Sequence, residues 1–152
     1  LNIVKKSNVE LVIIGKGEKE IEIKRYIDLN NLNKKVRLLG YKKNPFPYIK
    51  QADLFLLTSK FEGLPNVLIE ALFLKKFIIS TNCPTGPKEI LNNGKFGELV
   101  KIGDYKKIAK LIDNFKKNKI VKNKINNGYK SLKKYNYKIN CEKYYQLIKY
   151  YI

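Results

Sequence analysis

Histidine, methionine and tryptophan are absent from the 152-residue sequence, and cysteine occurs only at Cys83 and Cys141. Without histidine the sequence cannot supply a Ser-His-Asp triad, a histidine general base or a cysteine-histidine zinc site. The spacing of the two cysteines matches no metal-binding or redox motif, so we expect free thiols, as is usual in the cytoplasm. No Asp-x-Asp pair is present either, and we predict no metal site.

Arginine and acidic residues are also scarce. Arg25 and Arg37 are the only arginines among 32 basic residues, and 13 acidic residues leave a formal net charge of +19. A field of this strength attracts anions, such as nucleotide phosphates, an anionic membrane face or nucleic acid. Nucleic acid is the least favoured of these, because the lysines are spread over every predicted helix instead of gathering in one groove among aromatic residues.

Long apolar runs and targeting signals are missing as well. No run approaches the roughly 20 residues of a membrane-spanning helix, and the start shows no signal-peptide pattern. We therefore expect a cytoplasmic protein. The inner face of the membrane is a second location, because lysines and tyrosines occur together near the C-terminus. The sequence opens on Leu1 instead of Met, and we interpret its 152 residues as one domain of a longer protein.

Short apolar runs alternate with helical patterns along the chain. Strands are expected at residues 10–15, 36–40, 52–59, 77–80 and 97–100. Helices are expected at residues 18–30, 48–51, 64–74, 88–91, 104–115, 119–134 and 139–151. Strands that alternate with helices predict an α/β fold, with a Rossmann-like parallel sheet covered by helices on both faces.

The segment 59–70 runs from a predicted strand end through a loop into a helix. In an open parallel sheet, ligands bind beyond the carboxyl ends of the strands. The N–H groups of Gly63, Leu64 and Asn66 would be free at the helix start, whereas Pro65 has no N–H group. Together with the helix dipole, these amides favour a phosphate group.

Two carboxylates accompany this anion site, Glu62 just before the helix and Glu70 about two turns along it. A purely anionic ligand would be repelled by both, whereas a ligand with phosphates and hydroxyls could donate hydrogen bonds to both. The alternative is that Glu62 caps its own helix and that Glu70 is an ordinary surface residue.

The whole segment resembles the Glu-x7-Glu motif of the retaining, two-domain (GT-B) glycosyltransferases of family 4. The resemblance continues, in the right order, through residues 11–17, 36–41, 52–56, 84–91 and 97–100. It implies that residues 1–152 are a single C-terminal, donor-binding domain of a GT-B fold. The acceptor-binding domain of such an enzyme lies outside this sequence.

By the same resemblance, Glu70 should bind the ribose hydroxyls of a nucleoside diphosphate sugar, and Glu62 should contact hydroxyls of the transferred sugar. The backbone from Gly63 through Leu64 and Pro65 to Asn66 should hold the diphosphate and the sugar.

Other residues are expected at the donor from the same resemblance: Gly15, Gly17, Gly40, Tyr41, Thr85 and Gly86. The first two glycines should allow a close approach of the nucleotide, unless they only form a strand-to-helix turn. Gly40 and Tyr41 should lie along the base, and Thr85 and Gly86 should approach the donor.

The resemblance implies a hexosyltransferase that moves a sugar from a nucleoside diphosphate sugar, most readily a UDP-sugar, to a glycan or lipid-linked acceptor of polysaccharide synthesis. The resemblance also implies that no cofactor or metal is required. The main task of the protein is to stabilise negative charge on the leaving diphosphate. Family members supply an Arg and a Lys for this task from segments that precede this sequence. We therefore expect no transferase activity from these residues alone.

The resemblance further implies that the first, central strand of the sheet is missing, between the strands at 10–15 and 53–58. Open edges there would be costly, so we expect chain rearrangement or a neighbouring molecule, as in a dimer, to close the gap. Two other functions stay open. One is a nucleotide-sugar epimerase of the same architecture, which needs acid/base groups. The other is a non-enzymatic, basic nucleic-acid-binding module.

Overall fold

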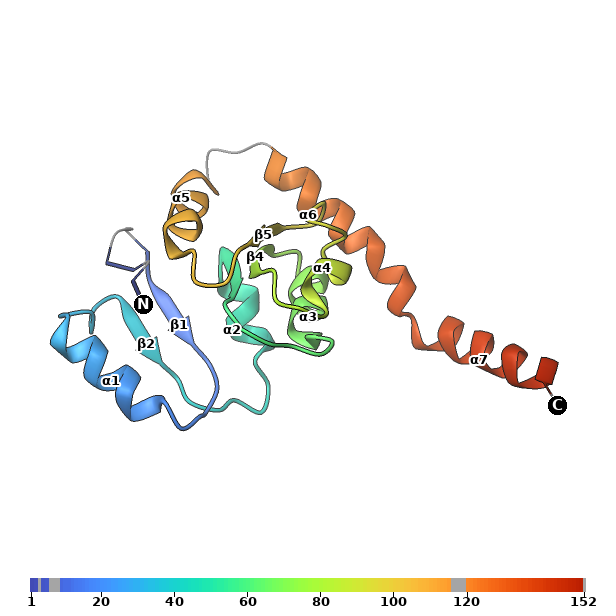
Figure 1. The fold of residues 1–152 in the computed structure, drawn as a ribbon, viewed down its shortest axis with the longest axis horizontal. Coiled ribbons are helices and arrows are strands. Elements are labelled where there is room, and N and C mark those ends of the chain that lie inside the picture. Colours follow the sequence, from blue (N-terminus) through green and yellow to red (C-terminus); the bar gives the residue numbers. More distant parts are fainter. Residues whose placement is uncertain (3, 6–8, 116–119, 152) are drawn as a thin grey trace.

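A computed structural model describes residues 1–2, 4–5, 9–115 and 120–151. The strands are β1 (Leu11–Ile13), β2 (Val36–Leu38), β3 (Leu54–Leu57), β4 (Phe77–Thr81) and β5 (Glu98–Val100). The helices are α1 (Glu20–Leu29), α2 (Phe46–Gln51), α3 (Asn66–Phe73), α4 (Pro87–Ile90), α5 (Tyr105–Phe115), α6 (Ile120–Ser131) and α7 (Tyr137–Tyr151), with a 3-10 turn η1 (Leu132–Tyr135). This alternation confirms the predicted α/β class (Figure 1).

The strands form two parallel sheets instead of one. In the N-terminal sheet β1 pairs with β2, and in the C-terminal sheet β4 lies between β3 and β5. Within the described ranges no strand joins β1 to β3, and these two strands are not paired with each other. The expected gap is therefore present, and the described part of the chain does not rearrange to close it. Closure by a second molecule stays a prediction.

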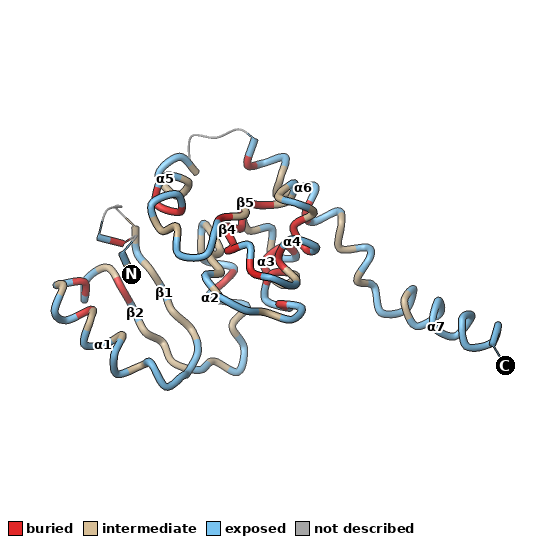
Figure 2. Tube along the Cα trace, viewed as in Figure 1, coloured by how far each residue is buried: buried red, intermediate tan, exposed pale blue. Residues whose placement is uncertain are grey.

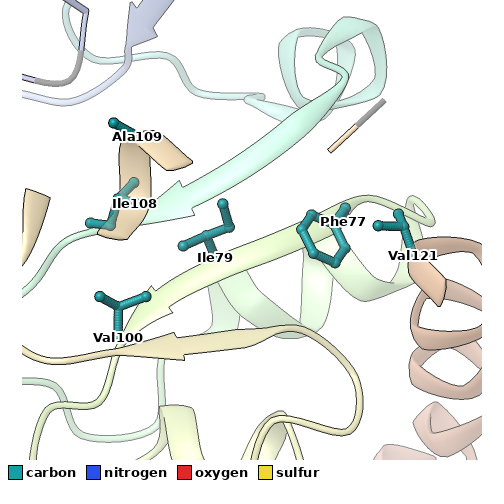
Figure 3. Close-up of a cluster of buried hydrophobic side chains, with 6 residues drawn as sticks. All are labelled: Phe77, Ile79, Val100, Ile108, Ala109 and Val121. Carbon is teal, nitrogen blue, oxygen red and sulfur yellow. The ribbon is translucent and has the colours of Figure 1, made fainter. Parts of the chain in front are cut away.

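The C-terminal sheet is covered on both faces. Phe77 and Ile79 of β4 pack on one face with α5 and the start of α6 (Figure 3). Ile78 points to the opposite face and packs among buried side chains of α3 and α4. All residues of β4 are buried, because strands flank it on both sides and helices cover it above and below. This sheet holds most of the buried core (Figure 2).

Among the described residues, the packing on the N-terminal sheet gathers on one face. Ile27 of α1 is buried against Val36 of β2, with Leu11 and Ile13 partly buried beside them. The other face carries Val12, which is 36% exposed, and Arg37, whose side chain pairs with Glu10. The predicted parallel strands flanked by helices are confirmed, and in the described residues α1 is the helix packed on β1 and β2.

The helix starts differ from the predicted ranges by one or two residues, and proline is involved in the differences at α2 and α3. Helix α3 begins at Asn66 instead of residue 64, because Pro65 precedes it with an extended ψ of 91°. Helix α2 begins at Phe46 instead of residue 48, because Pro47 is tolerated in a first turn and the side chain of Asn44 accepts a hydrogen bond from the Phe46 amide at 3.1 Å.

Helix α6 is fixed to the body, whereas α7 is not. The Nζ of Lys124 donates to the carbonyls of Gly94 and Gly97 at 2.9 and 3.1 Å and lies 2.6 Å from the carboxylate of Glu98. The predicted helix 119–134 ends instead in η1, and its residue 119 lies outside the described residues. Helix α7 projects from the body without a single buried residue (Figures 1 and 2). No described helix is both long and apolar enough to cross a membrane.

Candidate functional site

The loop after β3 leads into α3 and leaves the amino end of that helix free. Leu68, Ala71 and Leu72 are buried and anchor α3 to the sheet. No side chain caps the helix, and the amides of Gly63 and Leu64 have no hydrogen-bond acceptor within the described residues. The amino end of α3 thus presents uncompensated donors and the positive end of its dipole, as an anion site requires.

Glu62 and Glu70 flank this helix start, and both are half-buried. Within the described residues the carboxylate of Glu62 makes no hydrogen bond to α3, so the capping role considered as an alternative is not observed. Glu70 lies in the second turn of the helix, between the buried Leu68 and Ala71 in sequence, and is not a fully exposed surface residue. Two carboxylates without a described salt-bridge partner remain available to ligand hydroxyls.

The loop after β4 lies directly against the Glu62 loop. The hydroxyl of Thr85 donates a hydrogen bond to the carbonyl of Glu62. Gly86 has a φ of 86°, and a Cβ atom there would lie 2.3 Å from both the carbonyl oxygen of Gly63 and Cδ of Pro65. The structure therefore brings Glu62, Gly63, Pro65, Thr85 and Gly86 into one group.

A second group forms at the ends of β1 and β2. Gly15, Gly17 and Gly40 line a hollow of about 260 Å³, together with Lys16. The Gly15 amide donates to the carbonyl of Gly40 at 2.9 Å, and the φ of Gly40 is 65°, in the left-handed region that glycine favours. The adjoining Tyr41 ring is 67% exposed, so it is accessible to a ligand.

The two groups lie at the carboxyl ends of strands in different sheets, and no hydrogen bond or ion pair among the described residues joins them. Sequence reasoning missed Thr81, whose hydroxyl donates to the carbonyl of Ser59 at 2.6 Å and ties the two loops together at their base. No local pattern marks that residue. Cys83 is buried and Cys141 is exposed, and both are free thiols. The described residues contain no cluster of acidic or cysteine side chains able to hold a metal ion.

Comparison with known proteins supports this architecture. The model of the family described as glycosyl transferases group 1 matches residues 1–138. An N-acetylgalactosaminyltransferase of Campylobacter jejuni, named for its action on a diphospho-undecaprenol-linked acceptor, is 32% identical over 133 residues, which are 85% of this chain and 36% of the relative. An uncharacterized glycosyltransferase of Methanocaldococcus jannaschii is 48% identical over 84 residues, which are 55% of this chain and 21% of the relative.

Among solved structures, a TarM mutant from S. aureus in complex with Fondaparinux, alpha-GlcNAc-glycerol and UDP superposes with a TM-score of 0.84 at 26% identity, over 95% of this chain and 30% of that one. The chain thus spans about a third or less of these relatives. The family match agrees with the uncapped start of α3 and with the loops that lie beside it. The chain belongs to the family of group 1 glycosyl transferases.

Proposed function

We propose that residues 1–152 form the nucleotide-sugar-binding domain of a retaining GT-B glycosyltransferase of family 4. The donor is a UDP-sugar, and the acceptor is a glycan or a lipid-linked sugar of polysaccharide or glycoconjugate synthesis. The proposal draws on relatives named for such acceptors and on a similar solved structure that contains UDP. The acceptor-binding part lies outside these residues, which alone bind the donor without transferring its sugar.

The observation that carries the proposal is the free amino end of α3 between two half-buried carboxylates, Glu62 and Glu70. In the reaction the bond between the anomeric carbon and the diphosphate breaks, and negative charge grows on the leaving group. Amides and a helix dipole that are fixed beforehand stabilise that charge without reorganising. The carboxylates accept hydrogen bonds from hydroxyls of the ribose and the transferred sugar, and so set the orientation of the donor.

Membership of a transferase family favours this function over the epimerase and the nucleic-acid-binding module. The donor's base is expected along Gly40 and Tyr41, and Gly15 and Gly17 should allow a close approach of the nucleotide, where Lys16 adds positive charge. The protein is expected to work in the cytoplasm, with peripheral contact to the inner face of the membrane near a lipid-linked acceptor.

Calorimetric titration of the 152-residue chain with UDP, GDP and ADP tests the proposal. We expect UDP to bind most tightly. Glu70→Gln should weaken binding by roughly 10- to 100-fold, because a hydrogen bond to a charged group contributes about 1.5–3 kcal/mol. The matched control is Glu142→Gln, on the exposed helix α7, which should bind like the unaltered chain. No heat with any nucleoside diphosphate, or equal affinities for both variants, would contradict the proposal.

A further inference from the structure

The loop between β4 and α4 contacts the Glu62 loop at several points, and nothing assigned so far explains why the fit is so close. We propose that Thr85 and Gly86 are positioning residues. They brace the segment from Glu62 to Asn66 and hold its amides and carboxylate in the geometry that the donor requires. This inference rests on the proposed function, and it departs from the expectation that these two residues act by touching the donor themselves.

Gly86 provides the steric half of the brace. The neighbouring loop occupies the space that a side chain at position 86 would need, since a Cβ atom there would lie 2.3 Å from the Gly63 carbonyl oxygen and from Cδ of Pro65. Neither obstacle can rotate away, because one is backbone and the other belongs to a closed ring. Pro65 is itself buried and precedes α3 directly. Any side chain at position 86 must therefore displace the backbone that leads into the helix.

Thr85 provides the polar half. Its hydroxyl donates a hydrogen bond to the backbone carbonyl of Glu62 and so fixes the peptide group next to the Glu62 side chain. The base of the same two loops is tied by the hydrogen bond from Thr81 to Ser59. The Glu62 loop is thus held at its start by β4 and at its end by Thr85 and Gly86.

Thr85 and Gly86 are held rigidly because the residues that follow them in the chain are buried. Pro87, Ile90 and Leu91 are all buried in the C-terminal sheet's core, and the Ile90 amide donates to the carbonyl of Gly86 at 2.9 Å. Displacing Gly86 would require moving these residues, and packed interiors resist such shifts. A side chain at position 86 should consequently move the softer partner, the exposed loop at Gly63 and Leu64.

Gly94 offers a matched control. Its φ of 87° is within a degree of that of Gly86, so alanine is placed at a positive φ, which L residues rarely adopt, at both positions. However, a Cβ atom at Gly94 would have only the Gly97 carbonyl oxygen nearby, at 3.8 Å, which is an ordinary contact. Gly94 also precedes β5, at the opposite end of the strands from the site loops. The two variants therefore share the positive φ and differ in whether the new Cβ atom displaces the Glu62 loop.

The test is UDP titration of Gly86→Ala and Gly94→Ala, at a temperature where circular dichroism shows both folded. We expect Gly86→Ala to bind UDP at least tenfold more weakly, because small misplacements of binding groups are costly, and Gly94→Ala to bind normally. Thr85→Val should weaken binding about three- to tenfold, and Thr85→Ser, which keeps the hydroxyl, should restore it.

The outcomes separate the two proposals. If the unaltered chain binds no nucleoside diphosphate, the proposed function fails. If it binds UDP and the Gly86→Ala variant binds equally well, the brace is refuted while the function stands. Should Gly86→Ala fail to fold, the Thr85 pair decides, since equal affinities of Thr85→Val and Thr85→Ser would refute the brace.

Discussion

The two sheets of this protein are made from similar apolar strands but reach different degrees of burial. Every residue of β4 is buried, whereas β1 has none that is fully buried and exposes Val12. The strand β3, with the sequence Leu-Phe-Leu-Leu, is only half-buried although it pairs with β4. Apolar composition alone therefore does not determine burial. What decides it is whether a strand has neighbours on both edges and helices on both faces.

This difference bears on the candidate site. The Glu62 loop and its brace arise from the well-packed C-terminal sheet, whereas Gly15, Gly17 and Gly40 arise from the thinner N-terminal sheet. We infer that the group around Glu62, proposed above to hold the diphosphate and sugar, is rigid before binding, and that the group around Gly40, proposed to hold the base, opens locally at lower free energy.

The largest expected effect on the free energy of unfolding comes from removing side-chain volume from the core. Ile79→Ala, in the fully buried β4, should lower the free energy of unfolding by about 2–5 kcal/mol, because it leaves a cavity that the sheet cannot fill. Ile13→Ala deletes the same atoms from the half-buried β1 and should cost clearly less. Urea unfolding monitored by circular dichroism measures both values. Equal costs would show that the N-terminal sheet is as tightly packed as its partner.

A medium effect is expected where α6 is fastened to the C-terminal sheet. Lys124→Met should destabilise the protein by about 1–3 kcal/mol, because Glu98 and two backbone carbonyls lose a partly buried charged donor. Lys122→Met is the control on the same helix, since that side chain is exposed, and should change stability by less than about 0.5 kcal/mol. Thermal denaturation compares the two variants. A similar loss of stability in both would show that Lys124 does not hold α6 to the C-terminal sheet.

The smallest effect is electrostatic and belongs to the N-terminal half. A hydrogen bond from Lys24 and its charge hold the pKa of Glu20 below its usual value of 4.5. The contribution of Glu20 to stability is therefore fully present above that value, and it is lost as the pH falls through the lower pKa of the folded state. Because the pair is exposed, Glu20→Gln should flatten the acid limb of the stability curve only slightly. Acid titration at low salt measures it, and a steeper acid limb in the variant would contradict this assignment.

Local sequence patterns were sufficient for the element order and for one site motif. The run from Glu10 to Gly15 indicates β1, and the Glu-x7-Glu spacing places one carboxylate before the helix start and the other within the helix. Proline set limits on this precision, because Pro65 stands before α3 instead of inside its first turn. Whether a proline precedes or enters a helix depends on its ψ angle, which the sequence does not specify.

The chain order of strands and helices and the placement of Glu62 before its helix follow from the sequence by itself, because each depends on neighbours a few residues away. Only the tertiary structure decided that Thr85 contacts Glu62, from which it is separated by 23 positions. It also decided that the ring of Pro65 occupies the space beside Gly86. Those contacts require the parallel register that sets Leu57 beside Ser80. Register is a property of the paired strands, and no single segment encodes it.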